Sequence, residues 1–212
     1  MEITWLGHSC FRLRGKEATV ITDPYDKSLG YTLGKPTASI VTVSHHHPDH
    51  DCIATVGDKP KIVDAPGEYE ISNILITGIA TFHDGQKGKI RGKNTAYLIE
   101  IDDVTVCHLG DLGHVPSSEQ VEEMSDVDIL LTPVGGVSTM NAAVAAETVS
   151  LVQPKIVIPM HFKTEVVKQE LEPLDRFLKE MGLKKIAPQP KLTIGKTSLP
   201  SQTQVVVLDY RR

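Results

Sequence analysis

Short apolar runs flanked by polar positions dominate the first hundred residues of the chain. Their β-branched and alternating side chains are typical of strands, and turn formers such as Gly15 and Gly57 separate them. The predicted strands cover residues 2–7, 10–14, 18–22, 39–44, 61–65, 74–82 and 95–101. This half of the protein is therefore expected to consist mainly of β-structure.

Helical patterns alternate with apolar runs in the second half. Ser117 or Ser118 can cap the first of these helices, and Gly182 can end the last one. The predicted helices cover residues 117–124, 141–152 and 166–181, and the predicted strands cover 104–110, 128–134, 155–160 and 203–210. No low-complexity linker and no convincing repeat interrupts this mixed α/β pattern. A single domain over residues 1–212 is expected.

Composition narrows the classes of function. The chain has 212 residues, long enough for one domain with a buried core. Its 22 Lys and Arg against 27 Asp and Glu give a net charge of −5, which argues against extended nucleic acids and acidic membranes as partners. The N-terminus lacks the pattern of a signal peptide, and no apolar run is long enough to span a membrane, so a cytoplasmic location is expected. The 3 cysteines lack C-x-x-C spacing, which predicts reduced thiols.

The sequence SHHHPDHD at residues 44–51 concentrates metal-binding side chains at the end of an apolar strand. Pro48 cannot continue the ladder of hydrogen bonds, so the strand must stop before it. In locally extended chain, residues two apart point the same way. His45 and His47 are therefore expected to converge on one point, with His46 turned away from it.

Further candidate ligands follow the same logic. Pro48 suits the first turn of a helix, which would aim Asp49 and His50 at the same place. His83, Asp111 and His161 each stand directly after an apolar β run. Functional groups collect at the carboxyl ends of strands in α/β sheets, so these endings are expected to converge on a metal site.

These motifs resemble the metallo-β-lactamase superfamily. The resemblance rests on SHHHPDHD, His83, HLGD at 108–111 and PMHF at 159–162, and it runs from WLGHSCF to IVIPMHFKT. The motifs ITDP, PGEYEI, RGKN, HLGDLGH and PVGG are similar to a branch of small metal-dependent hydrolases related to L-ascorbate 6-phosphate lactonase. The resemblance implies an α/β fold, the αββα four-layer sandwich of this superfamily, with two metals at one edge of its paired sheets.

The resemblance also implies the ligand sets. The first metal would be bound by His45, His47 and His83, the second by Asp49, His50 and His161, with Asp111 as a bridge between them. Imidazole and carboxylate ligands suit two divalent ions, zinc or manganese. A metal-bound hydroxide would be the nucleophile, and Asp49 would orient it or pass a proton to the leaving group.

Other polar residues are candidates for support. Asp23 would accept a proton from a ligating histidine, although an Asx turn is the alternative. His8 would support the ligands or face the substrate, unless it is a buried, hydrogen-bonded histidine. His108 and His114 flank Asp111 and are expected to support it rather than to bind metal.

Arg91 and Asn94 in the RGKN motif are candidates for binding a substrate anion, with a solvated loop as the alternative. Summing the charges of two dications, two carboxylates and a hydroxide leaves about one positive charge on the site. That excess favours small anionic substrates.

The sequence thus predicts a binuclear metal-dependent hydrolase acting on a small anionic ester, a lactone or a phosphodiester. The alternative is a non-catalytic metal-binding or sensor protein of the same fold. A redox enzyme is disfavoured because the di-iron members of the superfamily carry a glutamate where His47 stands. Antibiotic hydrolysis is not supported either, because the commonest β-lactamases carry a cysteine where Asp111 stands. The expected partner is a small-molecule substrate, and a homo-oligomer is compatible with the sequence.

Overall fold

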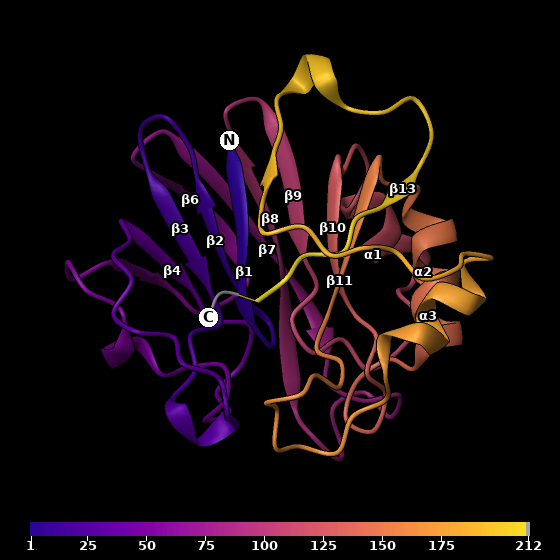
Figure 1. The fold of residues 1–212 in the computed structure, drawn as a ribbon. Coiled ribbons are helices and arrows are strands. Elements are labelled where there is room, and N and C mark those ends of the chain that lie inside the picture. The colour runs from indigo at the N-terminus through magenta and orange to yellow at the C-terminus, as the bar shows by residue number, and fades with distance from the viewer. Residues whose placement is uncertain (211–212) are drawn as a thin grey trace.

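A computed structural model describes residues 1–210 of the chain, in which two β-sheets pack against each other (Figure 1). The first sheet has the order β12-β1-β2-β3-β4-β5 and the second the order β13-β11-β10-β9-β8-β7-β6. The strands of the first sheet are β1 (Glu2–Gly7), β2 (Cys10–Arg14), β3 (Thr19–Thr22), β4 (Ile40–Thr42), β5 (Lys61–Val63) and β12 (Leu192–Thr193). Those of the second are β6 (Gly67–Ile71), β7 (Ile74–Phe82), β8 (Lys93–Ile101), β9 (Val104–His108), β10 (Ile129–Pro133), β11 (Ile156–Met160) and β13 (Gln204–Val205).

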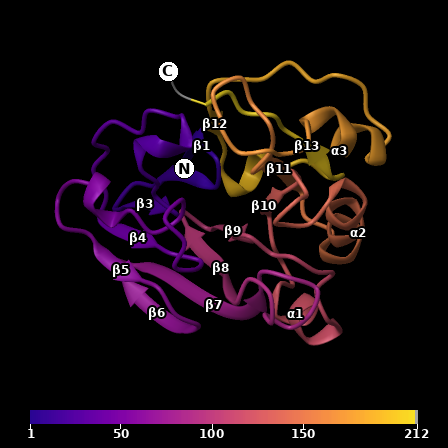
Figure 2. The same ribbon diagram turned by 90° about the horizontal axis from the view of Figure 1, so that it is seen from below.

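The α-helices lie outside the seven-stranded sheet, as Figure 2 shows. They are α1 (Ser118–Glu123), α2 (Ala142–Val152) and α3 (Leu174–Glu180). On the outer face of the six-stranded sheet, the 3₁₀ turns η1 (Lys27–Leu29) and η2 (Ile53–Thr55) and their connections pack over a smaller apolar cluster. A third 3₁₀ turn, η3 (Lys196–Ser198), precedes β13. The predicted α/β sandwich is confirmed, with its second helical layer reduced to short turns.

One predicted helix is much shorter than expected. The pattern over residues 166–181 forms a helix only at α3, and Pro173 occupies its N-cap. Proline has no N–H to donate and disfavours helical backbone in the residue before it, so the helix cannot extend toward residue 166. The segment before Pro173 is instead a loop that passes close to the candidate site.

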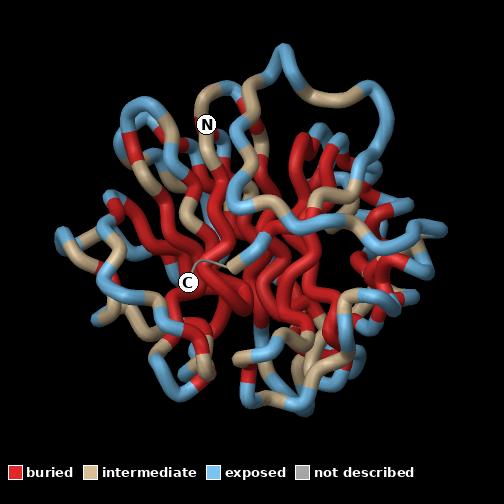
Figure 3. Tube along the Cα trace, viewed as in Figure 1, coloured by how far each residue is buried: buried red, intermediate tan, exposed pale blue. Residues whose placement is uncertain are grey.

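The main core lies between the sheets, where Figure 3 shows buried chain. Trp5, Phe11 and Leu13 of the first sheet and Tyr97 and Ile99 of the second are fully or almost fully buried. The Tyr97 hydroxyl also donates to the carbonyl oxygens of Val43 and Val63, at 2.9 and 3.2 Å. Since Val43 directly precedes the histidine-rich motif, this contact fixes the motif relative to the second sheet.

The directions of the strands bring the predicted ligands together. β3 and β4 run parallel, as do β9, β10 and β11, and β7 has the direction of β9 because each is antiparallel to β8. The carboxyl ends of parallel strands meet at one edge of a sheet. Within residues 1–210, no helix is long and apolar enough to cross a membrane.

Candidate metal centre

Asp111 lies at the centre of the converging side chains. Its Oδ2 is 3.3 Å from Nε2 of each of three histidines, His50, His83 and His161, and 4.0 Å from His45 Nε2. These neighbours come from both predicted ligand sets. Asp111 therefore lies between the two predicted ligand sets.

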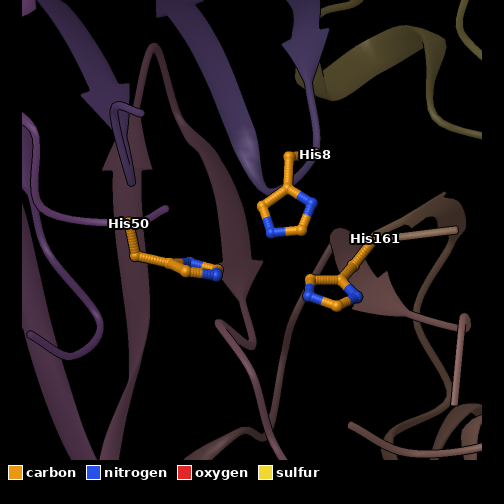
Figure 4. A group of neighbouring side chains, drawn as sticks. All are labelled: His8, His50 and His161. Carbon is orange, nitrogen blue, oxygen red and sulfur yellow. The ribbon is translucent and has the colours of Figure 1, made fainter. Parts of the chain in front are cut away.

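The remaining donors fall into groups compact enough to hold a cation. The nitrogens of His45, His47 and His83 lie within 4.8 Å of one another. Asp49 Oδ2 is 3.8 Å from His50 Nε2, on the other side of the centre. His8 was expected to support the ligands, to face the substrate or to be a buried, hydrogen-bonded histidine. Its ring lies with those of His50 and His161 in a group of the same compactness (Figure 4).

Asp23 orients two of these histidines. Its Oδ2 lies 2.9 Å from His50 Nδ1 and accepts a 2.6 Å hydrogen bond from Ser44 Oγ. The Ser44 hydroxyl gives its hydrogen to the carboxylate and must therefore accept from His45 Nδ1, which is 2.9 Å away. Both imidazoles thus carry hydrogen on Nδ1, so Nε2 is the nitrogen through which each would bind a metal. Ser44 was not among the predicted site residues, although it lies between a strand and His45.

Several buried nitrogen and oxygen atoms of the site lack hydrogen-bond partners, which suits the binding of a metal ion. His45 Nε2, His50 Nε2 and Asp111 Oδ1 are buried and have no hydrogen-bond partner among residues 1–210. A buried polar atom without a partner is destabilising, and native proteins almost always satisfy such atoms. Divalent cations bound to imidazole nitrogen and carboxylate oxygen would satisfy all three.

The electrostatics of the metal-free site also favour a cation. Burial alone would raise the pKa of Asp111, but His161 and His50 hold it well below its usual value. Burial alone would lower the pKa of His50, but Asp111 and Asp23 hold it well above its usual value. Burial and the neighbouring His50 lower the pKa of His45 to about 3. Asp111 is therefore ionised in this buried site, and its negative charge favours a positively charged group beside it.

Left-handed backbone also occurs at three residues of the site. His8, Asp23 and His161 adopt left-handed conformations, with φ of 54, 39 and 51°. Such conformations cost about 1–3 kcal/mol each for residues other than glycine and persist where the surrounding structure enforces them. Each of these residues directly follows a strand, so the strain turns its side chain into the site.

Asn94 supports the centre rather than binding an anion. Its side chain is buried, and its Nδ2 donates to Thr81 Oγ1 and to the carbonyl oxygen of Leu109, at 2.7 and 2.9 Å. Its Oδ1 accepts from the backbone N–H of Asp111. Both amide hydrogens are used, so none remains for an anion, and the anion-binding role predicted for Asn94 is wrong.

His108 and His114 brace the loops that carry other site residues. His108 is fully buried, and its Nε2 is 2.8 Å from the carbonyl oxygen of Ser9, next to His8. His114 accepts a hydrogen bond from the backbone N–H of Phe82, which precedes His83. Neither ring belongs to a compact donor group within the described chain, which agrees with a supporting role.

Asp84 shapes the loop after His83 and was not singled out from the sequence. Its carboxylate accepts backbone N–H hydrogen bonds of 2.7 to 3.0 Å from Gln86, Gly88, Ile90 and Arg91. These donors, with that of Arg91 foremost, lower the pKa of Asp84 to about 2. An acid followed by glycine is a turn signal that could have identified it.

A pocket of about 570 Å³ opens beside the first donor group. His45 to His47 form one wall, and the side chains of Ala80, Phe82, Arg91 and Lys93 contribute to the others. The pocket is large enough for a small molecule next to the metal ligands. His46 is 66% exposed, with Nδ1 3.5 Å from Asp51 Oδ2, and so points away from the donor groups as predicted.

Comparisons with known proteins agree with the predicted fold. The model of the family described as "Beta-lactamase superfamily domain" matches residues 2–161. A UPF0173 metal-dependent hydrolase of Pyrobaculum islandicum is 30% identical over 204 residues, which cover 81% of this chain and 89% of the relative. The chain therefore belongs to the metallo-β-lactamase superfamily, among the UPF0173 metal-dependent hydrolases.

Solved structures extend this similarity to three dimensions. A protein from Thermotoga maritima, assigned to the Zn-dependent hydrolases of the metallo-β-lactamase superfamily, has a TM-score of 0.81 and 38% identity, covering 98% of this chain and 97% of its own. Igni18, a metallo hydrolase from Ignicoccus hospitalis, has a TM-score of 0.62 at 20% identity and covers 91% of this chain and 98% of its own. The first similarity includes sequence, whereas the second shows the fold alone. The predicted superfamily is confirmed.

Proposed function

We propose that the protein is a hydrolase that holds two divalent ions, zinc or manganese, and cleaves a small anionic ester, either a lactone or a phosphodiester. The position of Asp111 carries this proposal, because one carboxylate lies 3.3 Å from His50, His83 and His161. The name of the Thermotoga maritima relative supports zinc and hydrolysis. When bound, such ions polarise a substrate oxygen and make water more acidic.

Asp49 is the residue best placed to handle a proton. Burial alone would raise its pKa, but His8 and His50 hold the pKa of Asp49 below its usual value, so it is a carboxylate at neutral pH. Its Oδ2 accepts a 2.7 Å hydrogen bond from Gln169 Nε2, which fixes its orientation. The ionised, oriented carboxylate can position an attacking water and relay its proton to the leaving group.

The loop after His83 supports an anionic substrate. It carries Lys87, Lys89 and Arg91, and Lys93 follows at the start of β8. All four side chains are exposed, and within residues 1–210 no carboxylate lies within 4.0 Å of their nitrogens. Arg91 Nη2 donates to the carbonyl oxygen of Val137, which holds the guanidinium at the pocket. Unpaired cations beside a pocket draw in anions, even in a protein of net charge −5.

A non-catalytic metal protein would not need this arrangement. A purely structural metal site is closed by its protein ligands. Here a pocket of about 570 Å³ reaches His45 and His47. The opening favours an enzyme over a storage or sensor protein.

The test is a paired kinetic comparison. The wild-type protein and His45→Ala are loaded with zinc or with manganese and assayed on a phosphorylated lactone and on bis-p-nitrophenyl phosphate. We expect one substrate to be hydrolysed by the wild type and not by the variant. Hydrolysis of neither above the variant's background would refute the proposed substrate class, and fewer than two bound metals per wild-type chain would refute the binuclear centre.

A further inference from the structure

The ring of His8 is buried without a conventional partner. The residue is 1% exposed, and neither Nδ1 nor Nε2 makes a hydrogen bond within the described chain. Its backbone is firmly held, because its carbonyl oxygen accepts from Trp5 Nε1 at 2.9 Å and from the N–H of His161 at 3.2 Å. The protein thus fixes the position of this imidazole, and the polar contact of its ring within residues 1–210 is the 3.3 Å approach of Nε2 to Asp49 Oδ2.

The alternatives expected for His8 do not describe this environment. A buried histidine in a core is normally hydrogen-bonded, as His108 is to Ser9. A residue that faces substrate from a pocket wall would be more exposed, and His8 does not line the pocket beside His45. The ring instead faces the donor cluster, where Asp49 is its charged neighbour.

The distances around His8 are those between ligands of one metal ion. Donors bound at about 2.0–2.2 Å to a common ion lie about 3.0–3.5 Å apart when they are neighbours in its coordination shell. His8 Nε2 is 3.3 Å from Asp49 Oδ2, and Asp111 Oδ2 is 3.3 Å from Nε2 of both His50 and His161. Each of these three pairs thus has the spacing of neighbouring donors in one coordination shell.

The three imidazole rings of His8, His50 and His161 also lie close enough together to share one metal ion. The centroid of His8 is 4.1 Å from that of His161 and 5.0 Å from that of His50. Figure 4 shows the three rings around a common space, each reaching it from a different segment of the chain. The donor nitrogens of this group lie within 4.8 Å of one another, as do those of His45, His47 and His83.

We propose that His8 is a direct ligand of the second metal, together with Asp49, His50, His161 and the shared Asp111. This assignment rests on the binuclear centre proposed above. It gives the second metal three imidazoles, as many as the first has, and one carboxylate more. A shell of five protein donors suits an ion that accepts five or six ligands, such as manganese, better than a strictly tetrahedral one.

The experiment uses cobalt(II) as a spectroscopic probe of the metal shell. His8→Gly removes the imidazole, and glycine adopts the left-handed backbone at φ 54° without strain. We expect the variant to bind one cobalt ion at least about 10²-fold more weakly, since loss of even an outer partner of a ligand costs about 10- to 100-fold. The visible absorption of that ion should change, and added imidazole should restore it by filling the cavity.

His46→Gly is the matched control for metal binding, because His46 lies within the same motif but points to Asp51. It should keep both cobalt affinities and the wild-type spectrum, with or without imidazole. If His8→Gly does not fold by circular dichroism, His8→Asn replaces it, since asparagine tolerates left-handed backbone and is too short to ligate.

The outcomes separate the two proposals. A wild-type chain that binds two cobalt ions, together with a His8 variant of unchanged affinity and spectrum, would overturn the assignment of His8 alone. A weakened site whose spectrum imidazole does not restore would also overturn it, because His8 would then act only through Asp49. A wild-type chain that binds fewer than two cobalt ions would defeat the binuclear centre and this inference with it.

Discussion

Asn94 holds Asp111 in place across 17 residues of chain, through a 2.9 Å hydrogen bond from the Asp111 backbone N–H to Asn94 Oδ1. Asp111 in turn touches histidines of both predicted ligand sets. The side chain at the centre of the site therefore depends on an amide that, within residues 1–210, hydrogen-bonds to no other predicted ligand. Loosening this amide should disturb both metals together.

Asn94→Ala should reduce the affinity of both metal positions by about 10- to 100-fold, the usual effect of removing an outer partner of a ligand. It should also destabilise the protein by about 1–3 kcal/mol, because the buried N–H of Asp111 and the carbonyl oxygen of Leu109 lose their partner. Metal titration and denaturant unfolding measure the two effects. Gln202→Ala, an exposed amide, is the control, and unchanged metal affinity in Asn94→Ala would contradict the prediction.

Ser44→Ala should act mainly on the first metal. Removing the hydroxyl leaves His45 Nδ1 without its partner, while His50 keeps its direct contact with Asp23. We therefore expect one of the two metal affinities to fall by about 10- to 100-fold and the other to change little. Isothermal titration with zinc distinguishes the two positions. Ser150→Ala is the control, because it removes an exposed hydroxyl bonded within its own helix and should leave both affinities intact. If Ser44→Ala weakens both metal positions equally, Ser44 does not act through His45 alone.

Much of the site could be predicted because sheet topology dictates it. Strands of common direction end at one edge, so His83, Asp111 and His161 had to converge once the strands and their directions were known. The i and i+2 relation of His45 and His47 was likewise a local property of extended chain. These predictions needed only the order and direction of the strands.

The supporting contacts could not be predicted because they depend on side-chain packing between distant segments. Asp23 and Ser44 are brought together by the parallel pairing of β3 with β4, and the choice of rotamer then decides which atom each contacts. Asn94 was interpreted from its neighbours in the RGKN motif as an anion ligand, but its place at the start of β8 buries it. The prediction of a helix over residues 166–181 gave too little weight to Pro173, which prevents the helix from beginning before Leu174.

Metal removal should lower the thermal stability of the protein. The ions would satisfy buried donors such as His45 Nε2 and His50 Nε2, which otherwise lack partners among residues 1–210. A ligand present at about 1,000 times its Kd stabilises the folded state by about 4 kcal/mol, which corresponds to about 10 °C for a chain of this size. Calorimetry with and without chelator measures the shift. His45→Ala should show a smaller one, and an unchanged melting temperature in the wild type would contradict metal binding by the folded state.

Asp84→Asn should impair substrate binding more than turnover. The amide hydrogens of asparagine would face backbone N–H groups that now donate to the carboxylate, so the loop carrying Arg91 should lose its fixed shape. We expect KM for an anionic substrate to rise several-fold while kcat changes less, because the loop binds the substrate away from the metals. Steady-state kinetics at constant metal loading separate the two. Asp126→Asn, an exposed acid with φ of 64°, is the control, and an equal loss in kcat would place Asp84 in the chemical step.

Asp49→Asn should separate chemistry from folding. The substitution conserves shape, and the remaining carbonyl oxygen can still accept from Gln169 Nε2, so the fold should persist. The amide is not a base at neutral pH, and we therefore expect turnover to fall by about 10² to 10⁴-fold, the usual contribution of a positioned acid or base. The measurement is kcat on the better of the lactone and the phosphodiester, with metal content determined for each preparation. Asp58→Asn, an exposed acid with φ of 67°, should retain full activity. If Asp49→Asn keeps wild-type turnover at full metal loading, Asp49 carries no proton in the reaction, and its role is limited to holding the second metal.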